Sequence, residues 1–188
     1  MGRTYEAMDD RMERFFERQH VFFVGTAPSD VDGHVNVSPK GLGGTFTVLD
    51  PHTVAYLDLP GSGVETIAHL RDNGRIVVMF CTFEGPPRIV RLHGHGEVIP
   101  AAHAKFDELA GRFPARAGIR SVIVIRVERI SDSCGFGVPE MRFEAERSGL
   151  DRWAESKGVE GIAQYQAAKN AVSIDGLPGL ASPAREPS

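Results

Sequence analysis

Two short stretches of the sequence hold the side chains best suited to bind a polar or anionic ligand. In the first, strand alternation places Asn36 and Ser38 on one face. Pro39 marks a strand end or edge, because proline cannot donate to a β-ladder. Lys40 follows there, one of only four lysines in the chain, and Gly41 comes next. Glycine lets a ligand approach the backbone closely, so this strand end is a candidate binding surface.

The second stretch joins a strand to a helix through small residues. An apolar segment over residues 53–59 meets a turn containing Gly61, Ser62 and Gly63, and residues 64–72 then show the apolar spacing of a helix. Unpaired N–H groups at the start of a helix can bind an anion. We therefore expect this turn to face the first stretch and to share a ligand with it.

The polar residues of this turn allow two interpretations. In the first, the hydroxyl groups of Ser62 and Thr66 donate to a bound anion together with backbone N–H groups. In the second, Ser62 is the N-cap and Glu65 follows at the third helical position, which is an S-x-x-E capping box and needs no ligand.

Other residues with chemical potential receive simpler interpretations. His93 and His95 share a strand face, but no cysteine or third histidine is near them in sequence, so surface or interface polarity is favoured over a metal site. Cys81 and Cys134 are far apart and lack the spacing of a metal or redox motif. A reduced cytosolic chain is the simplest interpretation, with a disulfide only if the fold brings the two together.

The elements that must position these groups are mostly short strands. Alternating or continuous apolar runs predict strands over residues 21–26, 34–38, 45–49, 53–59, 75–83, 88–99 and 121–127. Helical spacing predicts helices over residues 5–19 and 64–72, a short helix is expected near 102–111, and a composition rich in Ala, Glu, Gln and Lys favours a helix over 150–169. Short strands with few, short helices favour a mainly β protein built as a small antiparallel barrel.

The length of the chain suits one domain. Of its 188 residues we assign 1–170 to that domain, with a barrel core at about 20–145 and a helical part at 148–170. The C-terminal helix should break near Gly158 and Gly161. Residues 171–188 are expected to form a loosely ordered tail, because several glycines and prolines interrupt any helix there.

The bulk composition indicates a soluble globular protein. Hydrophobic residues make up 41% and charged residues 24% of the chain, and the net charge is -4. That charge gives no overall attraction to nucleic acid or an anionic membrane. We see no signal peptide and no apolar run of about 18 residues, so a cytoplasmic location without nucleic-acid or membrane partners is expected.

Taken together, these pieces resemble the pyridoxamine 5'-phosphate oxidase-like family of FMN-binding split barrels. The resemblance runs from Val21 to about Ile130, and its order and spacing are specific where no single motif would be. The matching motifs are a strand pair around residues 32–33, the Val-Ser-Pro-Lys strand end at 37–40, the Tyr-x-Asp-x-x-Gly-Ser-Gly turn at 56–63, the Ala-His-Leu-Arg-Asp-Asn-Gly-Arg segment at 68–75 and the Leu-His-Gly-His-Gly-Glu-Val strand at 92–98.

The resemblance implies a split β-barrel with N-terminal and C-terminal helices that works as a homodimer, with FMN in a cleft between the subunits. It implies an FMN-dependent oxidoreductase acting on an unidentified small molecule, without identifying a catalytic residue. The residues expected to bind the flavin are Asn36, Ser38, Pro39, Lys40, Gly41, Leu57, Asp58, Gly61, Ser62, Gly63, Glu65 and Thr66, with Cys134 and Phe136 as a second wall that reaches the partner subunit's flavin.

The sequence departs from the family pattern at the start of the second helix. Members usually carry a lysine or arginine there to neutralise the flavin phosphate, whereas this chain has Glu65 and Thr66. Lys40 or an arginine of a second subunit would have to supply the charge. The departure keeps open a deazaflavin-dependent reductase and a protein that binds a flavin or another flat ligand without turnover. True pyridoxamine phosphate oxidase activity is less well supported, because the C-terminal segment around Trp153 lacks that enzyme's substrate motif.

Overall fold

The computed structural model describes residues 2–41 and 43–180. Most strands lie where the alternation predicts them, and the last strand is longer than expected because its second half pairs with the first half of the strand before it. The elements in chain order are β1 (Thr4–Tyr5), α1 (Asp10–Glu17), β2 (Val21–Thr26), β3 (Asn36–Gly41), β4 (Phe46–Asp50), β5 (Thr53–Asp58), α2 (Glu65–Asp72), β6 (Arg75–Cys81), β7 (Arg88–Pro100), α3 (Phe106–Ala110), β8 (Ser121–Cys134) and α4 (Gly149–Lys169).

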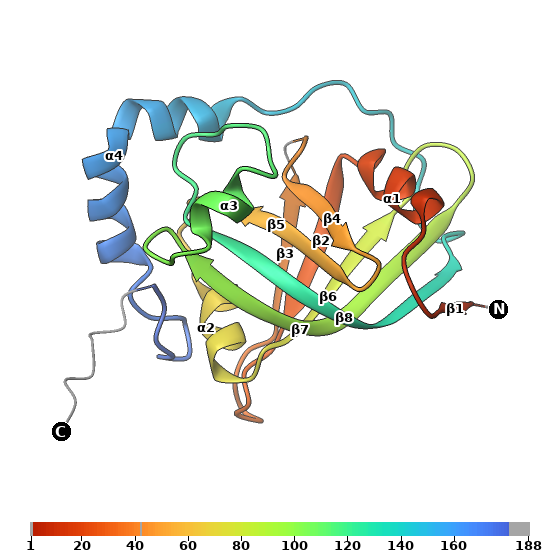
Figure 1. Cartoon of the computed structure of the whole chain (residues 1–188), viewed down its shortest axis with the longest axis horizontal. Coiled ribbons are helices and arrows are strands. Elements are labelled where there is room, and N and C mark those ends of the chain that lie inside the picture. Colours follow the sequence, from red (N-terminus) through yellow and green to blue (C-terminus); the bar gives the residue numbers. More distant parts are fainter. Residues whose placement is uncertain (1, 42, 181–188) are drawn as a thin grey trace.

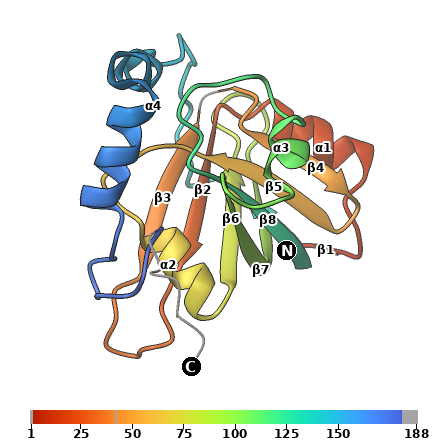
Figure 2. The same cartoon turned by 60° about the vertical axis from the view of Figure 1, so that its left-hand side comes forward.

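All the strands of the described residues belong to one antiparallel sheet. Its order is β3-β2-β6-β7-β8-β5-β4, with β1 paired to β8. The sheet curls into an open barrel, and α1 and α2 lie at opposite ends of it (Figures 1 and 2). The predicted mainly β split barrel with flanking helices is confirmed.

Aromatic side chains fill the barrel. Phe22, Phe46 and Phe80 pack with ring centroids 4.9–5.4 Å apart. Phe16 of α1 joins them, 4.6 Å from Phe80, so this helix closes one end of the core. Ile67 of α2 belongs to the same buried cluster. Closing both ends with amphipathic helices buries the apolar face of a strongly curved sheet.

Helix α1 is shorter than the expected span of residues 5–19. The side chain of Asp9 accepts a hydrogen bond from the backbone N–H of Met12 at 2.9 Å, which makes Asp9 the N-cap and starts the helix at the next residue. Thr4 and Tyr5 instead pair with β8. Helix α3 is also shorter than residues 102–111. The sequence predicted both helices but not the residues at which they begin and end.

Residues 171–180 are more ordered than the expected loose tail. Val172 forms a β-bridge with Pro178, and Leu180 packs against the core. Arg71 of α2 donates a hydrogen bond to the carbonyl oxygen of Gly179. The glycines and prolines therefore shape a turn that folds back on α2. The expectation for residues 181–188 lies outside the described residues.

Helix α4 runs along the outside of the barrel and is broken at one of the two expected places. Gly158 has a φ of 63° and separates two helical pieces.

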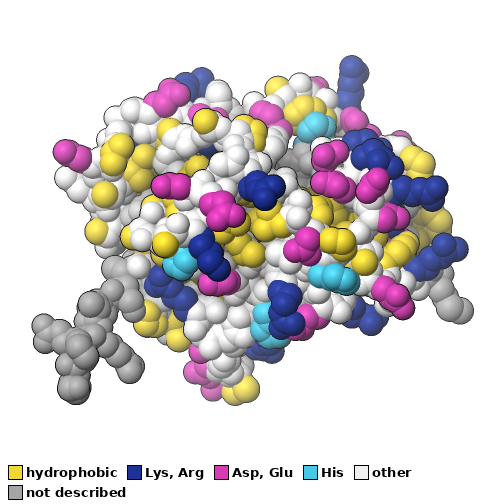
Figure 3. All heavy atoms as spheres, in the orientation of Figure 1, with side chains coloured by type: hydrophobic (Ala, Val, Ile, Leu, Met, Phe, Trp, Pro, Cys, Tyr) yellow, Lys and Arg dark blue, Asp and Glu magenta, His cyan; other side chains and the backbone are white. Residues whose placement is uncertain are grey.

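Between residues 2 and 180, the gap at 42 excepted, no helix combines the length and apolar character required to cross a membrane. In Figure 3, basic and acidic side chains are interspersed over the face shown.

The register shift between β7 and β8 requires a glycine, which gives a test of the fold. A Cβ on Gly94 would collide with the carbonyl oxygen of Arg126. We predict that Gly94→Ala lowers the free energy of unfolding by about 1–3 kcal/mol, as overpacking does, measured by denaturant unfolding. Gly137→Ala is the control, because a Cβ there meets nothing within 4 Å. Equal stability of the two variants would contradict the tight approach.

Candidate functional site

A cavity of about 320 Å³ opens where the end of β3 meets the connection from β5 to α2. These segments are not neighbours in the sheet, since β3 is at one edge and β5 is near the other. Curling of the sheet brings them together, so the two polar stretches do face each other. The lining residues are Ser38, Pro39, Lys40, Gly41, Leu57, Leu59, Pro60, Gly61, Gly63, Glu65, Thr66, Arg120 and Leu150.

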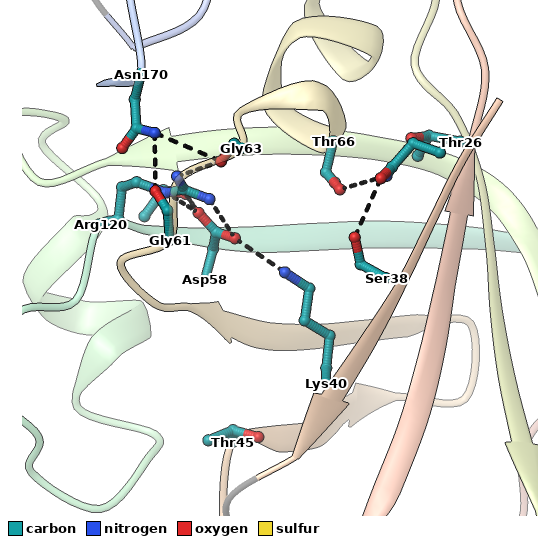
Figure 4. Close-up of polar contacts among 12 residues, drawn as sticks. Thr26, Ser38, Lys40, Thr45, Asp58, Gly61, Gly63, Thr66, Arg120 and Asn170 are labelled. Atoms are coloured by element: carbon teal, nitrogen blue, oxygen red, sulfur yellow. Dashed lines mark hydrogen bonds and ion pairs between the residues drawn. The ribbon is translucent and has the colours of Figure 1, made fainter. Parts of the chain in front are cut away.

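A fully buried carboxylate, Asp58, lies behind this cavity at the end of β5. Arg120 binds it through two donors, Nε at 2.6 Å and Nη2 at 3.1 Å. The Lys40 Nζ atom lies 3.5 Å from the same carboxylate, and the Ser121 hydroxyl donates to it at 3.3 Å (Figure 4). Burial would raise the pKa of Asp58, but Arg120 and Lys40 outweigh it and hold the pKa below its ordinary value. Asp58 is therefore ionised at neutral pH.

Arg120 also shapes the turn between β5 and α2. Its Nη1 donates to the carbonyl oxygen of Gly63 at 2.8 Å. From the C-cap of α4, the buried Asn170 side chain donates to the carbonyl oxygens of Gly61 at 2.9 Å and Gly63 at 3.5 Å. In Figure 4 both side chains approach the turn from the side opposite Lys40. These bonds hold the glycine turn in one shape.

Sequence reasoning missed both Arg120 and Asn170. The side chain of Arg120 is 4% exposed, and its partner Asp58 is 62 residues away in sequence. Asn170 is 109 residues from Gly61. For Arg120 the sequence offered one indication: an arginine stands directly before the most apolar strand. A charged side chain that enters a core needs a partner of opposite charge.

A chain of hydrogen bonds centred on Asn36 forms another part of the site. Its amide nitrogen donates to the hydroxyl oxygens of Thr26 and Thr66, both at 3.1 Å, and its amide oxygen accepts from Ser38 at 3.1 Å. Thr26 in turn lies 3.0 Å from Nδ1 of the fully buried His69, whose pKa burial lowers. Because the Thr66 oxygen accepts from Asn36, its own hydrogen remains free to donate to a ligand.

The helix start differs from the predicted capping box. Helix α2 begins at Glu65, and its N-cap is Val64, which has no side-chain capping bond. The interpretation in which Ser62 caps the helix is therefore wrong, and Ser62, which was also expected to bind the flavin, does not line the cavity. The Glu65 carboxylate lies close against Gly63. The first-turn N–H groups of α2 have no partner within the helix and border the cavity.

Two positive and two negative side chains surround the cavity, so an anion requires a cation that is not fully committed to a carboxylate. Lys40 and Arg120 face Asp58 and Glu65. Arg120 is committed to Asp58 and Gly63, whereas the Lys40 side chain is 22% exposed and its contact to Asp58 is longer. Lys40, the Thr66 hydroxyl and the helix start together fit a phosphate group, and Glu65 opposes it. Lys40 is thus the cation able to turn towards a bound anion.

The loop predicted as a second wall lies away from this cavity within one chain. Cys134 lines a different cavity, and Phe136 is 84% exposed and lines neither. Their contact with a partner subunit's flavin stays a prediction.

Both cysteines are free, and no group of three or more possible metal ligands occurs within the described ranges. Of the paired histidines, His95 contacts Glu128 at 3.1 Å.

The buried ion pair gives a prediction with a defined pH dependence. We expect Asp58→Asn to lower the free energy of unfolding by about 3–5 kcal/mol, because it leaves Arg120 buried without a counter-charge. Since the folded-state pKa lies below the ordinary 3.8, the advantage of the wild-type protein is complete above that pH and disappears as the pH falls through the lower folded value. Chemical denaturation across this range measures it.

The half-exposed pair of Arg116 and Asp151, 2.8 Å apart, supplies the control. Asp151→Asn should cost at most about 1 kcal/mol. If the two substitutions cost the same, Asp58 does not have the structural role described.

Comparison with known proteins agrees with this architecture. The family model described as pyridoxamine 5'-phosphate oxidase matches residues 8–134. The pyridoxamine 5'-phosphate oxidase family protein ustO of Aspergillus flavus is 40% identical over 198 residues, covering 97% of this chain and 79% of ustO.

Two crystal structures of HupZ from Group A Streptococcus share the fold at 24% identity. One has a TM-score of 0.51 and covers 66% of this chain and 98% of HupZ. The other has a TM-score of 0.50 and covers 65% and 91%. Given the match over most of the barrel and the identity to ustO, this chain belongs to the pyridoxamine 5'-phosphate oxidase family.

Proposed function

We propose that the protein is an FMN-binding flavoprotein, an FMN-dependent oxidoreductase that acts on a small molecule. One observation carries the proposal: Lys40 of β3 lines the same cavity as the Thr66 hydroxyl and the start of α2, which follows β5, a strand that is not paired with β3. A cation, a free hydroxyl hydrogen and unpaired N–H groups are what a phosphate group requires. Membership of the family supports the choice of a flavin.

In this proposal the chain supplies binding and orientation. Lys40, Thr66 and the first-turn N–H groups would hold the phosphate, while Asn36 fixes the direction of the Thr66 hydroxyl. Bound FMN would supply hydride transfer, for which no side chain has to form the hydride. Asp58 is turned into the protein and bound by Arg120, so it acts as a positioning group for Lys40.

A homodimer is part of the proposal. The cavity of about 320 Å³ is at the small end of ligand sites, so it would enclose only part of a flavin nucleotide. Val35, next to edge strand β3, and Val37, within it, are 72% and 66% exposed beside the site. Apolar side chains on an unpaired edge are commonly covered by another chain. A second subunit there would bury these valines and cover the rest of the flavin.

One observation favours a second candidate function. Glu65 stands at the helix start, where a carboxylate repels a phosphate dianion. It favours a protein that binds a flavin or another flat ligand without turnover.

The absorption spectrum of the purified protein, recorded after FMN addition and dialysis, tests the proposal. Retained flavin bands that bleach with a reductant and return with a small-molecule oxidant support the oxidoreductase. Retained flavin that no donor reduces supports the second candidate. A protein that stays colourless contradicts the flavoprotein and favours the binding of a flat ligand other than a flavin.

The charge assignment gives a sharper prediction. We expect Lys40→Gln to weaken FMN binding about 10- to 100-fold, because it removes a charge-assisted contact of about 1.5–3 kcal/mol. Riboflavin, which lacks the phosphate, should be affected less than about threefold. Glu65→Gln should tighten FMN binding and leave riboflavin binding unchanged, since it removes a repulsive charge. Flavin fluorescence quenching measures all four affinities.

Lys157→Gln is the matched control, since this lysine is exposed on α4 and does not line the cavity. If Lys40→Gln weakens FMN and riboflavin equally, Lys40 does not bind the phosphate.

A further inference from the structure

A second cavity, of about 1140 Å³, lies at the α1 end of the barrel. Its walls come from α1, the start of β2, the β6–β7 connection and the end of β8. The extended segment of residues 139–148, here called the strap, crosses over it on the way to α4 and contributes Met141, Arg142 and Phe143. The cavity is much larger than the one beside Lys40.

The strap is held in place by specific contacts, so the cavity is a formed feature of the fold. The backbone N–H of Met141 donates to the carbonyl oxygen of Phe83 at 3.0 Å, and that of Phe143 donates to the Glu84 carboxylate at 2.7 Å. The Phe143 ring stacks on His20, with ring centroids 3.5 Å apart and planes at 6°. These contacts fix the middle of the strap.

The carboxylates of this cavity are already bound by protein donors. Asp9 caps α1, and Glu84 accepts from the strap. Asp132 accepts from Arg88 at 3.0 Å and from the backbone N–H of Arg3 at 2.9 Å. None of the three carboxylates therefore needs a hydrogen bond from another arginine of the cavity.

Arginine is in excess over these carboxylates. Among the described residues, Arg88 is the one lining arginine that forms an ion pair. Four further guanidinium groups line the walls and have no carboxylate within 4.0 Å there: Arg3, Arg11, Arg18 and Arg142. The cavity is therefore electropositive and has free planar donors, which match a carboxylate through paired N–H groups.

Flat apolar surface lies beside these guanidinium groups. Phe15 and Phe83 line the walls, and Phe143 and Met141 remain 38% and 56% exposed there. Exposed apolar side chains that line a large hollow, with a few polar groups converging on it, are typical of a site for an organic ligand. Aromatic faces and guanidinium planes both stack on a planar ring.

We propose that this cavity binds an aromatic carboxylate, with the ring between apolar side chains and the carboxylate on Arg142 of the strap and Arg18 at the C-cap of α1. This cavity and the Lys40 cavity share no lining residue, although Val21 of the first pairs with Gly41 of the second across β2 and β3. The proposal concerns binding alone and does not depend on a flavin.

Isothermal titration calorimetry of the full chain with 2-naphthoate, and with 2-naphthamide as its neutral isostere, tests the proposal. The wild-type protein should bind the carboxylate at least tenfold more tightly than the amide. The double variant Arg18→Gln/Arg142→Gln should weaken the carboxylate at least tenfold and leave the amide unchanged. Arg147→Gln is the matched control, because it lies in the same strap outside the cavity and should alter neither affinity.

Phe143→Leu provides a second variant that keeps the charges. It should weaken both ligands, since it removes the ring from the wall. Equal affinity for carboxylate and amide, absence of binding, or a double variant that binds like Arg147→Gln would each overturn the proposal. The oligomeric state of the wild-type protein and of the double variant is measured in parallel. If neither ligand binds and the wild-type protein is a dimer that dissociates in the double variant, a second copy of the chain fills the cavity instead.

Discussion

The buried ion pair between Asp58 and Arg120 is the interaction on which the candidate site depends. Removing two charges from water is costly, and such a pair is retained only where geometry and further hydrogen bonds offset that cost. Here Nη1 of the guanidinium also donates to the carbonyl oxygen of Gly63, and the carboxylate accepts from Ser121. One pair thus joins the end of β5, the start of β8 and the turn before α2. Lys40 is oriented by the same carboxylate.

The second requirement is the curvature of the sheet. Strands β3 and β5 belong to opposite parts of the hydrogen-bonded order, so neither alone contains a site. The aromatic core and the two end helices stabilise the curl that brings them together. The geometry of the candidate site is therefore coupled to core packing: a change that flattens the sheet would separate Lys40 from the start of α2 even if both local structures remained.

Local patterns in the sequence predicted the parts of the molecule that local physics determines. Alternation located the strands, and Ser38, Lys40 and Thr66 do line one cavity, whereas Asn36, Asp58 and Ser62 do not. The capping box failed because the turn is shaped by Arg120 and Asn170, contacts that no local pattern contains. The order of residues 171–180 was missed for the same reason, since Arg71 binds that turn across a long sequence separation. Sequence spacing predicted the contacts that strand pairing determines. It did not predict the contacts made by single side chains that are distant in sequence.

The bonds from Asn170 to the glycine turn have a consequence for how the protein is made. Asn170 follows α4, so the chain as far as this residue must leave the ribosome before its side chain can reach Gly61. The barrel strands end at Cys134 and can pair earlier. Long-range contacts form late because their loop-closure entropy is high. During synthesis, the strands of the barrel can therefore pair before Asn170 fixes the shape of the glycine turn.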